Sequence, residues 1–156
     1  MPDNPQPISF TVPAVPVAQP RQRHRLIATK AGRTFTHNYT PANHPVQAFK
    51  AAVQLAAHSA YHGPPLEGPL HLMLTFLLPR PARLIWKNRP MPRLPHDKKP
   101  DLDNLLKSFT DALSSILWRD DAQIAATVLA KMYAAGDEQP ATYVHLHPFS
   151  TLDMTK

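Results

Sequence analysis

Five charged residues between positions 101 and 121 have the types and spacing of a site that binds a metal ion and a phosphate. Asp101 and Asp103 are two residues apart, Lys107 follows four residues after Asp103, and the pair Asp120-Asp121 closes the segment. In an extended backbone the side chains of residues i and i+2 point to the same side, so the first two carboxylates could converge on one cation. Carboxylate oxygens favour a hard cation, which predicts Mg²⁺, with Mn²⁺ as an alternative.

The same segment has a simpler interpretation as a row of surface salt bridges. Asp103, Lys107 and Asp111 stand at i, i+4 and i+8, and each exposed pair would contribute only about 0.3–0.5 kcal/mol. Three further features favour a site. Pro100 disfavours helix at the residue before it, Asn104 adds another oxygen ligand or a helix cap, and the second acidic pair recurs after one helix.

An amphipathic helix is predicted over residues 104–117, directly after the first two carboxylates. Its apolar positions recur with helical spacing, and they are Leu106, Phe109, Leu113, Ile116 and Leu117. Lys107 lies off that face, one turn after Asp103. We expect Asp103 or Asn104 to cap the helix, and for Asn104 a cap is favoured over a supporting role at the site.

The run KPDLDNLLKSFTDALSSILWRDDAQI, residues 99–124, closely resembles the signature of the RusA family of Holliday junction resolvases. That signature reads approximately K-P-D-L-D-N-x-x-K, then F-x-D-A-L, a short turn and D-D-x-Q-[VI]. About a dozen positions agree in type and spacing, and a looser likeness covers the N-terminal third. Ser114-Ser115 stands where relatives often have a glycine, so the sequence does not determine the residue at which the helix ends.

The resemblance implies a site and an activity. The metal-binding aspartates of the family map onto Asp101, Asp103 and Asp121, and its helix lysine maps onto Lys107, which would stabilise charge on the phosphate. Beside these residues, we take Asp120 as a candidate to support the site without contacting the ion, and Asn104 as either a support of the site or a helix cap. The implied protein is a Mg²⁺-dependent homodimer that makes paired nicks in four-way DNA junctions during recombination and repair. The family is frequent in phages and prophages.

Composition and charge are consistent with a DNA-binding protein. The 156 residues suit one domain, residues 1–156. Seventeen Lys and Arg against eleven Asp and Glu give a net charge of +6, which weakly favours a polyanionic partner. The chain contains no cysteine, which is compatible with a reducing cytoplasm. Neither a signal peptide nor an apolar run long enough for a membrane span is evident, so we expect a cytoplasmic protein.

Two basic segments are the candidate DNA contacts. The first is a predicted hairpin with its tip at residues 31–33, and it carries Arg21, Arg23, Arg25, Lys30 and Arg33. The second is a proline-rich loop over residues 79–100, which carries Arg83, Trp86, Lys87, Arg89, Arg93, Lys98 and Lys99. Solvated basic loops are the alternative interpretation. The tryptophan could stack on a base or wedge into a junction, or it could anchor the loop to the core.

The remaining patterns predict an α/β (α+β) domain with a mixed sheet and two main helices. Strand patterns occur at residues 8–12, 70–78, 124–133 and 142–147, and the second is expected to be central because both its faces are apolar. A helix is predicted over 45–62, with Phe49, Val53, Ala56 and Ala60 on one face. Residues 134–138 are expected to form a hairpin turn, and residues 148–156 a polar tail.

Two histidine pairs have spacings that could bind a metal. They are His58 with His62 and His145 with His147, but neither pair has an evident third ligand, so surface histidines are the favoured interpretation. Two alternative functions remain open at this point. One is a non-catalytic DNA-binding module with structural salt bridges, and the other is a metal-dependent nuclease that acts on flap or other branched DNA.

Overall fold

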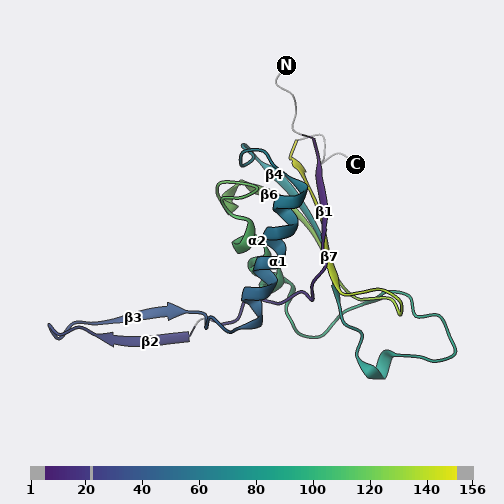
Figure 1. Ribbon diagram of the computed structural model, residues 1–156, viewed down its shortest axis with the longest axis horizontal. Helices are drawn as coiled ribbons and strands as arrows, with labels where there is room; N and C mark the ends of the chain where they lie inside the picture. Colours follow the sequence, from purple (N-terminus) through teal and green to yellow (C-terminus); the bar gives the residue numbers. More distant parts are fainter. Residues whose placement is uncertain (1–5, 22, 151–156) are drawn as a thin grey trace, which may run out of the picture.

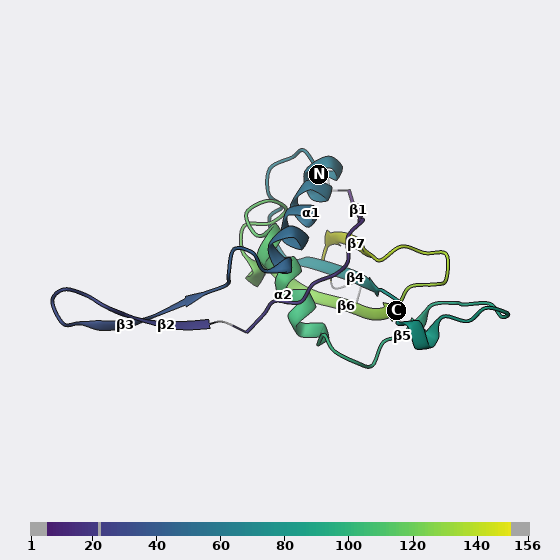
Figure 2. The same cartoon turned by 60° about the horizontal axis from the view of Figure 1, so that its bottom comes forward.

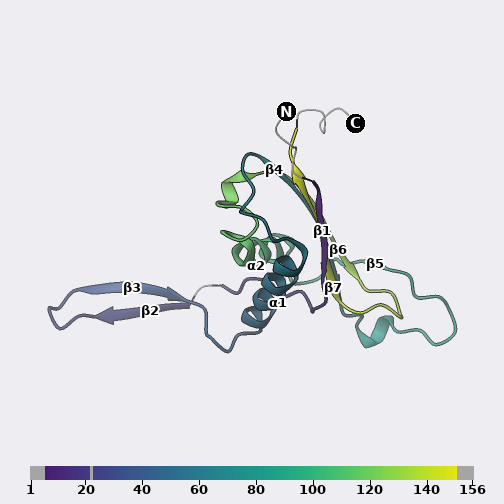
Figure 3. The same ribbon diagram turned by 45° about the horizontal axis from the view of Figure 1, so that its top comes forward.

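A five-stranded mixed sheet forms the centre of the protein, for which the computed structural model describes residues 6–21 and 23–150. The strand order is β1 (Ile8–Val12), β7 (Ala141–Pro148), β4 (Leu70–Leu78), β6 (Ile124–Tyr133) and β5 (Leu94–Pro95). Helices α1 (Pro45–Ala60) and α2 (Leu102–Leu113) lie on the same side of this sheet (Figures 1 and 3). The predicted α+β class is confirmed.

Strand β4 is the central strand, as predicted. It pairs in parallel with β6 and antiparallel with β7. Its alternate residues Leu70, Leu72, Leu74 and Phe76 are buried in the core shared with α1 and α2. His71, Met73 and Thr75 point the other way and are only half-buried. The helices therefore cover one face of the sheet, and α2 is held against the core beside β6.

Helix α1 ends at Ala60, two residues earlier than predicted. Pro45 occupies its first turn, and the Nδ1 atom of His44 accepts a hydrogen bond from the backbone N–H of Val46 (3.1 Å). The helix buries Val46, Phe49, Val53 and Ala57. Because the buried row at i, i+4 and i+8 passes through Ala57, the predicted positions Ala56 and Ala60 lie at or beyond its margin.

Helix α2 begins earlier than predicted, and the predicted caps are wrong. Asp101 is the N-cap, with extended backbone (φ −72°, ψ 143°) and no side-chain capping bond. Asp103 and Asn104 already lie in the first helical turn. Pro100 restricts the residue before it but not those after it, so the helix starts as soon as the proline has been passed.

The C-terminal end of α2 also differs from the prediction. The helix stops at Leu113, and Ser115 has φ +70°, in the left-handed region that favours glycine. The backbone N–H of Ser115 donates to the carbonyl of Trp118 (2.6 Å), which closes a tight turn. Leu117 and Trp118 are still fully buried because this turn returns the chain to the core.

The hairpin predicted at residues 134–138 is wrong. Strands β6 and β7 flank β4 on opposite sides, so they are not paired with each other. The connection between them passes the end of β4, where the N–H of Ala134 donates to the carbonyl of Leu78 (2.9 Å). Alternating sequence patterns on either side of a short turn do not distinguish a hairpin from a connection that crosses one strand.

The predicted basic hairpin is confirmed as a separate two-stranded sheet, which we call the arm (residues 23–39). It consists of β2 (Arg23–Ala28) and β3 (Thr34–Tyr39), with Gly32 at φ +74° in the tip. The arm projects away from the main sheet (Figures 1 and 2). The chain that precedes it is tied to α2, because the N–H of Gln19 donates to the Asn104 carbonyl (2.9 Å) and the Ser108 hydroxyl to the Val17 carbonyl (2.7 Å).

Within the described ranges, no helix is both long enough and apolar enough to cross a membrane. Of the predicted polar tail, residues 151–156 lie outside the described residues. Phe149 is half-buried, and its N–H donates to the Pro69 carbonyl (2.9 Å).

Candidate active site and DNA-binding surface

A cavity of about 370 Å³ lies where α2 meets the start of β6. Two acidic and one basic side chain share it with two threonines and two apolar residues, and the lining is Asp103, Leu106, Lys107, Thr110, Asp121, Ile124 and Thr127. Three of the four residues to which catalysis was assigned from sequence therefore meet at one concave surface. The oxygen-rich lining suits a hard cation and a phosphate.

The geometry of α2 explains why one carboxylate and the lysine meet. Residues i, i+3, i+4 and i+7 share one side of a helix, and this side carries Asp103, Leu106, Lys107 and Thr110 into the cavity. The opposite side is anchored by the buried residues Leu105, Phe109, Ala112 and Leu113. The predicted buried face included Leu106, which is instead half-buried in the cavity wall.

Asp121 comes from the other side of the cavity, at the start of the 3-10 turn η2 (Asp121–Gln123). The indole N–H of Trp118 donates to its Oδ1 atom (2.7 Å). The turn itself is a capping box. Asp120 accepts from the N–H of Ala122 (2.7 Å), and the side-chain oxygen of Gln123 accepts from the N–H groups of Arg119 (2.8 Å) and Asp120 (3.1 Å).

Asp101 does not line this cavity. Its carbonyl accepts from the N–H of Leu105 (3.1 Å), as an N-cap residue should, and its side chain is exposed. In residues 6–21 and 23–150, no three Asp, Glu, His or Cys side chains come together as a metal-binding group. Because α2 starts at Leu102, Asp103 is helical while Asp101 is extended, so the two do not share the extended backbone on which their predicted convergence was based.

The carboxylates at the cavity are exposed, and no ion pair within the described part of the chain involves Asp101, Asp103 or Asp121. Lys107 does have a partner. Its Nζ atom lies 3.3 Å from Asp111 Oδ1, and Asp111 Oδ2 lies 3.5 Å from Lys50 Nζ. The salt bridge predicted between Lys107 and Asp111 therefore exists, but the proposed row does not extend to Asp103.

Lys131 was missed by the sequence reasoning, although it supports the segment that leads into α2. Its Nζ atom donates to the carbonyls of Lys98 (2.6 Å) and Pro100 (2.7 Å). A lysine in a β-strand pattern has no sequence signal for such a role. The contact arises only because β6 and the loop before α2 meet in the fold.

The basic loop at residues 79–100 is held by specific side-chain contacts that its proline-rich, basic composition does not predict. Arg80, which was not among the predicted functional residues, donates to the carbonyls of Leu84 (2.8 Å), Pro92 (2.8 Å) and Ala134 (3.0 Å). Its guanidinium also lies 5.0 Å from the ring centre of Trp86. This arginine therefore holds the loop to the end of the sheet.

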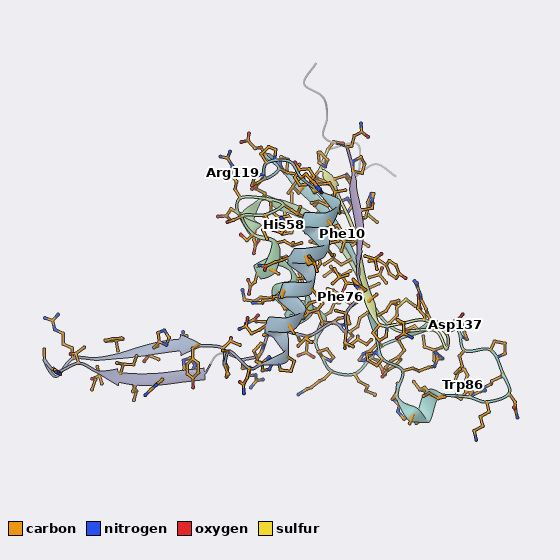
Figure 4. All side chains as sticks on the ribbon, in the orientation of Figure 1. Phe10, His58, Phe76, Trp86, Arg119 and Asp137 are labelled. Atoms are coloured by element: carbon orange, nitrogen blue, oxygen red, sulfur yellow. The ribbon has the colours of Figure 1, made fainter. Side chains whose placement is uncertain are left out.

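Trp86 packs inside this loop rather than in the core. Arg89 lies 3.7 Å from its ring centre, so that the indole is flanked by two guanidinium groups. Figure 4 shows Trp86 out in the loop and Phe76 between the helices and the sheet. The half-buried Trp86 is absent from the core cluster, so the core-anchor interpretation is wrong. A contact with DNA stays a prediction.

Arg93 is engaged by a carboxylate. It forms an ion pair with Glu138 that is bonded through both its Nε and Nη2 atoms. The hydrogen bond from Arg93 holds the pKa of Glu138 below its ordinary value, and the same bond raises the pKa of Arg93. This pair joins the basic loop to the β6–β7 connection. Arg93 is therefore less available to a phosphate than its exposed neighbours.

The other predicted DNA contacts are mostly exposed. The exposed ones are Arg21, Arg25, Lys30, Arg33, Arg83, Lys87, Arg89, Lys98 and Lys99. Lys98 is paired with Asp97 (3.4 Å), and the side chain of Arg23 lies outside what the structure describes. The arm contains no acidic residue, a feature that the sequence reasoning overlooked. No Asp or Glu occurs between Asp3 and Glu67.

The histidine pairs lie away from the cavity. His58 and His62 are exposed. His145 and His147 share one face of β7, where their ring centres are 5.5 Å apart, and His71 on β4 lies 4.9 Å from His147. These rings meet edge-on or tilted, on the sheet face that α1 and α2 do not cover.

Comparison with known proteins identifies a family and a relative. The family model described as "Endodeoxyribonuclease RusA" matches residues 13–147. An uncharacterized protein, YqaN, from Bacillus subtilis (strain 168) is 28% identical over 148 residues, which cover 92% of this chain and 97% of that protein. The match to the family model includes the arm, the basic loop, α2 and the acidic turn.

Proposed function

Because the chain belongs to the RusA endodeoxyribonuclease family, we propose that it is a Mg²⁺-dependent nuclease that resolves four-way DNA junctions by paired phosphodiester hydrolysis. The observation that carries this proposal is the cavity shared by Asp103, Lys107 and Asp121. It combines two carboxylates that have no ion-pair partner in the described part of the chain with the Lys107 ammonium, on a concave surface where a phosphate could bind.

The donor set fits a hard divalent cation. Asp103 and Asp121 offer carboxylate oxygens, and the hydroxyl-bearing residues Thr110 and Thr127 line the same cavity. We assign Asp103 and Asp121 as the principal ligands, and Asp101 as a third ligand on its residue type and its position in the family motif. The proposed ion is Mg²⁺, with Mn²⁺ as a substitute.

A bound divalent cation would supply Lewis-acid polarisation of the phosphate and activation of water. The chain's own residues would do the rest. Lys107 would place its ammonium against a non-bridging phosphate oxygen, where negative charge develops in the transition state. Asp120 and Gln123 would hold the acidic turn in place through their backbone hydrogen bonds, and Asn104 would support the first turn of α2 through its carbonyl.

The basic arm and the basic loop are the proposed DNA contacts. Their exposed Lys and Arg side chains would neutralise phosphates on the arms of the junction. Two cleavages in opposed strands require two sites, so we propose a homodimer. The proposed setting is DNA recombination or repair in the cytoplasm of a bacterial or phage-infected cell.

A substrate panel tests this proposal. Matched four-way, flap, duplex and single-stranded DNA substrates are incubated with the protein, with and without Mg²⁺. We expect symmetric paired nicks in the four-way junction, and only in the presence of the metal. Equal cleavage of flaps would favour the broader branched-DNA nuclease, and metal-independent binding without cleavage of any substrate would favour the non-catalytic module.

A further inference from the structure

Trp118 is a core residue whose one polar atom reaches the candidate active site. Its side chain is fully buried, with 0% exposure. The Nε1–H group donates to Oδ1 of Asp121 at 2.7 Å. A buried indole N–H needs an acceptor, and here the acceptor is an exposed carboxylate that lines the cavity.

The donor is held in place from several directions. Trp118 belongs to the hydrophobic core cluster, and its carbonyl accepts from the N–H of Ser115 (2.6 Å). Isolated bridges join its backbone to Leu66 and Ser114. The indole therefore cannot follow the carboxylate if the carboxylate rotates, and the core sets the orientation of Asp121.

The hydrogen bond leaves one carboxylate oxygen available. In the described part of the chain, Oδ1 of Asp121 has the Trp118 donor and Oδ2 has no hydrogen-bond donor or ion-pair partner. Asp103 has no comparable side-chain donor among the described residues. The two carboxylates of the cavity therefore differ, since only one of them is oriented by the core.

We propose that Trp118 is a positioning residue, which orients Asp121 so that Oδ2 is left to bind the divalent cation. This inference rests on the proposed function. Hydrogen-bond partners of metal-binding side chains fix their direction, and their loss typically weakens metal affinity about 10- to 100-fold. Trp118 would act through Asp121 and would touch neither the ion nor the DNA.

The first test measures metal affinity directly. Mn²⁺ binding to the wild-type protein is followed by the paramagnetic resonance of free Mn²⁺, without DNA. Trp118→Phe, which keeps an aromatic ring but loses the N–H, should bind Mn²⁺ about 10- to 100-fold more weakly. Phe76→Leu is the matched control, because it changes another fully buried aromatic, which lies on β4 opposite Lys131 rather than at the start of β6, where the acidic turn is. It should keep wild-type affinity.

A double-mutant cycle of Trp118→Phe and Asp121→Asn separates the orientation of Asp121 from a general loss of core packing as the cause of weaker Mn²⁺ binding. In an Asp121→Asn background, Trp118→Phe should have no further effect on Mn²⁺ affinity, because its target carboxylate is gone. An equal loss of affinity in both backgrounds would overturn the inference, and so would unchanged affinity in Trp118→Phe.

A second test does not depend on the folding of Trp118→Phe. The chain has two tryptophans, so Trp86→Phe leaves Trp118 as the one indole. Excitation of that indole should sensitise the luminescence of bound Tb³⁺. The hydrogen bond from Trp118 to Asp121 places the indole close to an ion held by that carboxylate, and energy transfer requires a short distance. Mg²⁺ should quench the signal by competition, and Asp121→Asn should remove it. Absence of a Mg²⁺-sensitive signal in a protein that binds Tb³⁺ would overturn the placement.

The two proposals can fail separately. If the wild-type protein binds no divalent cation and cleaves no junction, the proposed function fails. If it binds Mn²⁺ and cleaves junctions while Trp118→Phe binds Mn²⁺ with wild-type affinity, only the positioning role of Trp118 fails.

Discussion

At the scale of single residues, the candidate site depends on which charges are left unpaired. Asp103 and Asp121 have no ion-pair partner in the described part of the chain, whereas Lys107 is paired with Asp111. That pair is exposed and lies within one helix, so it is weak and easily exchanged for a phosphate. Asp111 can therefore hold the lysine near the cavity without preventing its use.

We predict that Lys107→Ala lowers the single-turnover cleavage rate by about 10²–10³ while changing junction affinity much less, because it removes charge stabilisation from the transition state. The measurement is quenched-flow cleavage at saturating protein. Asp111→Asn is the control, since it keeps the ammonium and removes only its partner, and it should cleave at least as fast as wild type. Full recovery of the Lys107→Ala rate at saturating protein would assign the lysine to binding alone.

At the scale of elements, the sequence predicted strands and helices well where a pattern is local. The alternation over residues 70–78 identified β4 with its observed bounds, and the arm followed from a Gly at a tip between two strands. Both ends of α2 were missed. They depend on backbone choices at Asp101 and Ser115 that helical periodicity does not record.

The site was predicted less completely than the elements that carry it. Residue types and spacing identified Asp103, Lys107 and the pair Asp120-Asp121, and the family resemblance selected Asp121 from that pair. Asp103, Lys107 and Asp121 do meet, whereas Asp101 does not line the cavity. The supporting contacts of Lys131 and Arg80 join segments far apart in the sequence, so no spacing rule could have revealed them. Trp118 is only three residues from its acceptor Asp121, but the two lie in an irregular turn that no helix or strand periodicity describes. The roles of all these residues in catalysis and binding stay predictions.

We predict that Ser115→Gly stabilises the protein by about 0.5–1 kcal/mol, because glycine adopts a positive φ without the strain that a Cβ atom causes. The melting temperature should rise by about 1–4 °C. Ser114→Gly is the matched control, since Ser114 has φ −55° and gains nothing from glycine. A lower melting temperature for Ser115→Gly than for wild type would show that the left-handed turn is not formed.

We predict that Lys131→Met loosens the segment before α2, because two carbonyl groups lose a charged donor at a cost of about 1–3 kcal/mol. The misplaced first turn should lower cleavage at least about tenfold. Limited trypsin digestion checks the structural step, since the bond after Lys98 should be cut sooner than in wild type. Unchanged digestion together with wild-type cleavage would show that Lys131 does not hold the segment before α2 in place.

At the scale of the whole molecule, the arm and the basic loop leave the α+β body at separate places (Figures 1 and 2). The candidate active-site cavity is formed by the body itself, at α2 and the start of β6. One backbone hydrogen bond and one from the Ser108 hydroxyl tie the chain before the arm to α2, and Lys131 ties the end of the basic loop to β6. Both basic segments are therefore anchored to the two elements that form the cavity, α2 and β6.

We predict that Arg83→Gln and Lys87→Gln each make the negative slope of log K against log salt shallower. The magnitude should fall by about 0.9 for every phosphate that the side chain neutralises in the wild-type complex, whichever DNA substrate is bound. Arg93→Gln should change the slope less, because Glu138 already engages that side chain. The slopes are measured by fluorescence anisotropy on four-way and duplex DNA between low and moderate salt. Equal effects from all three substitutions would mean that the Arg93–Glu138 pair opens on DNA.

The most direct test of the central claim is junction cleavage by isosteric, charge-removing variants of the cavity. Asp103→Asn and Asp121→Asn are compared with Asp137→Asn, the same chemical change at an exposed acid in the β6–β7 connection (Figure 4). Cleavage of a labelled four-way junction in Mg²⁺ and binding of the same junction are measured in parallel. We predict that both cavity variants lose cleavage but still bind the junction, and that Asp137→Asn behaves as wild type. Cleavage at the wild-type rate by either cavity variant would contradict the assignment of this cavity as the active site.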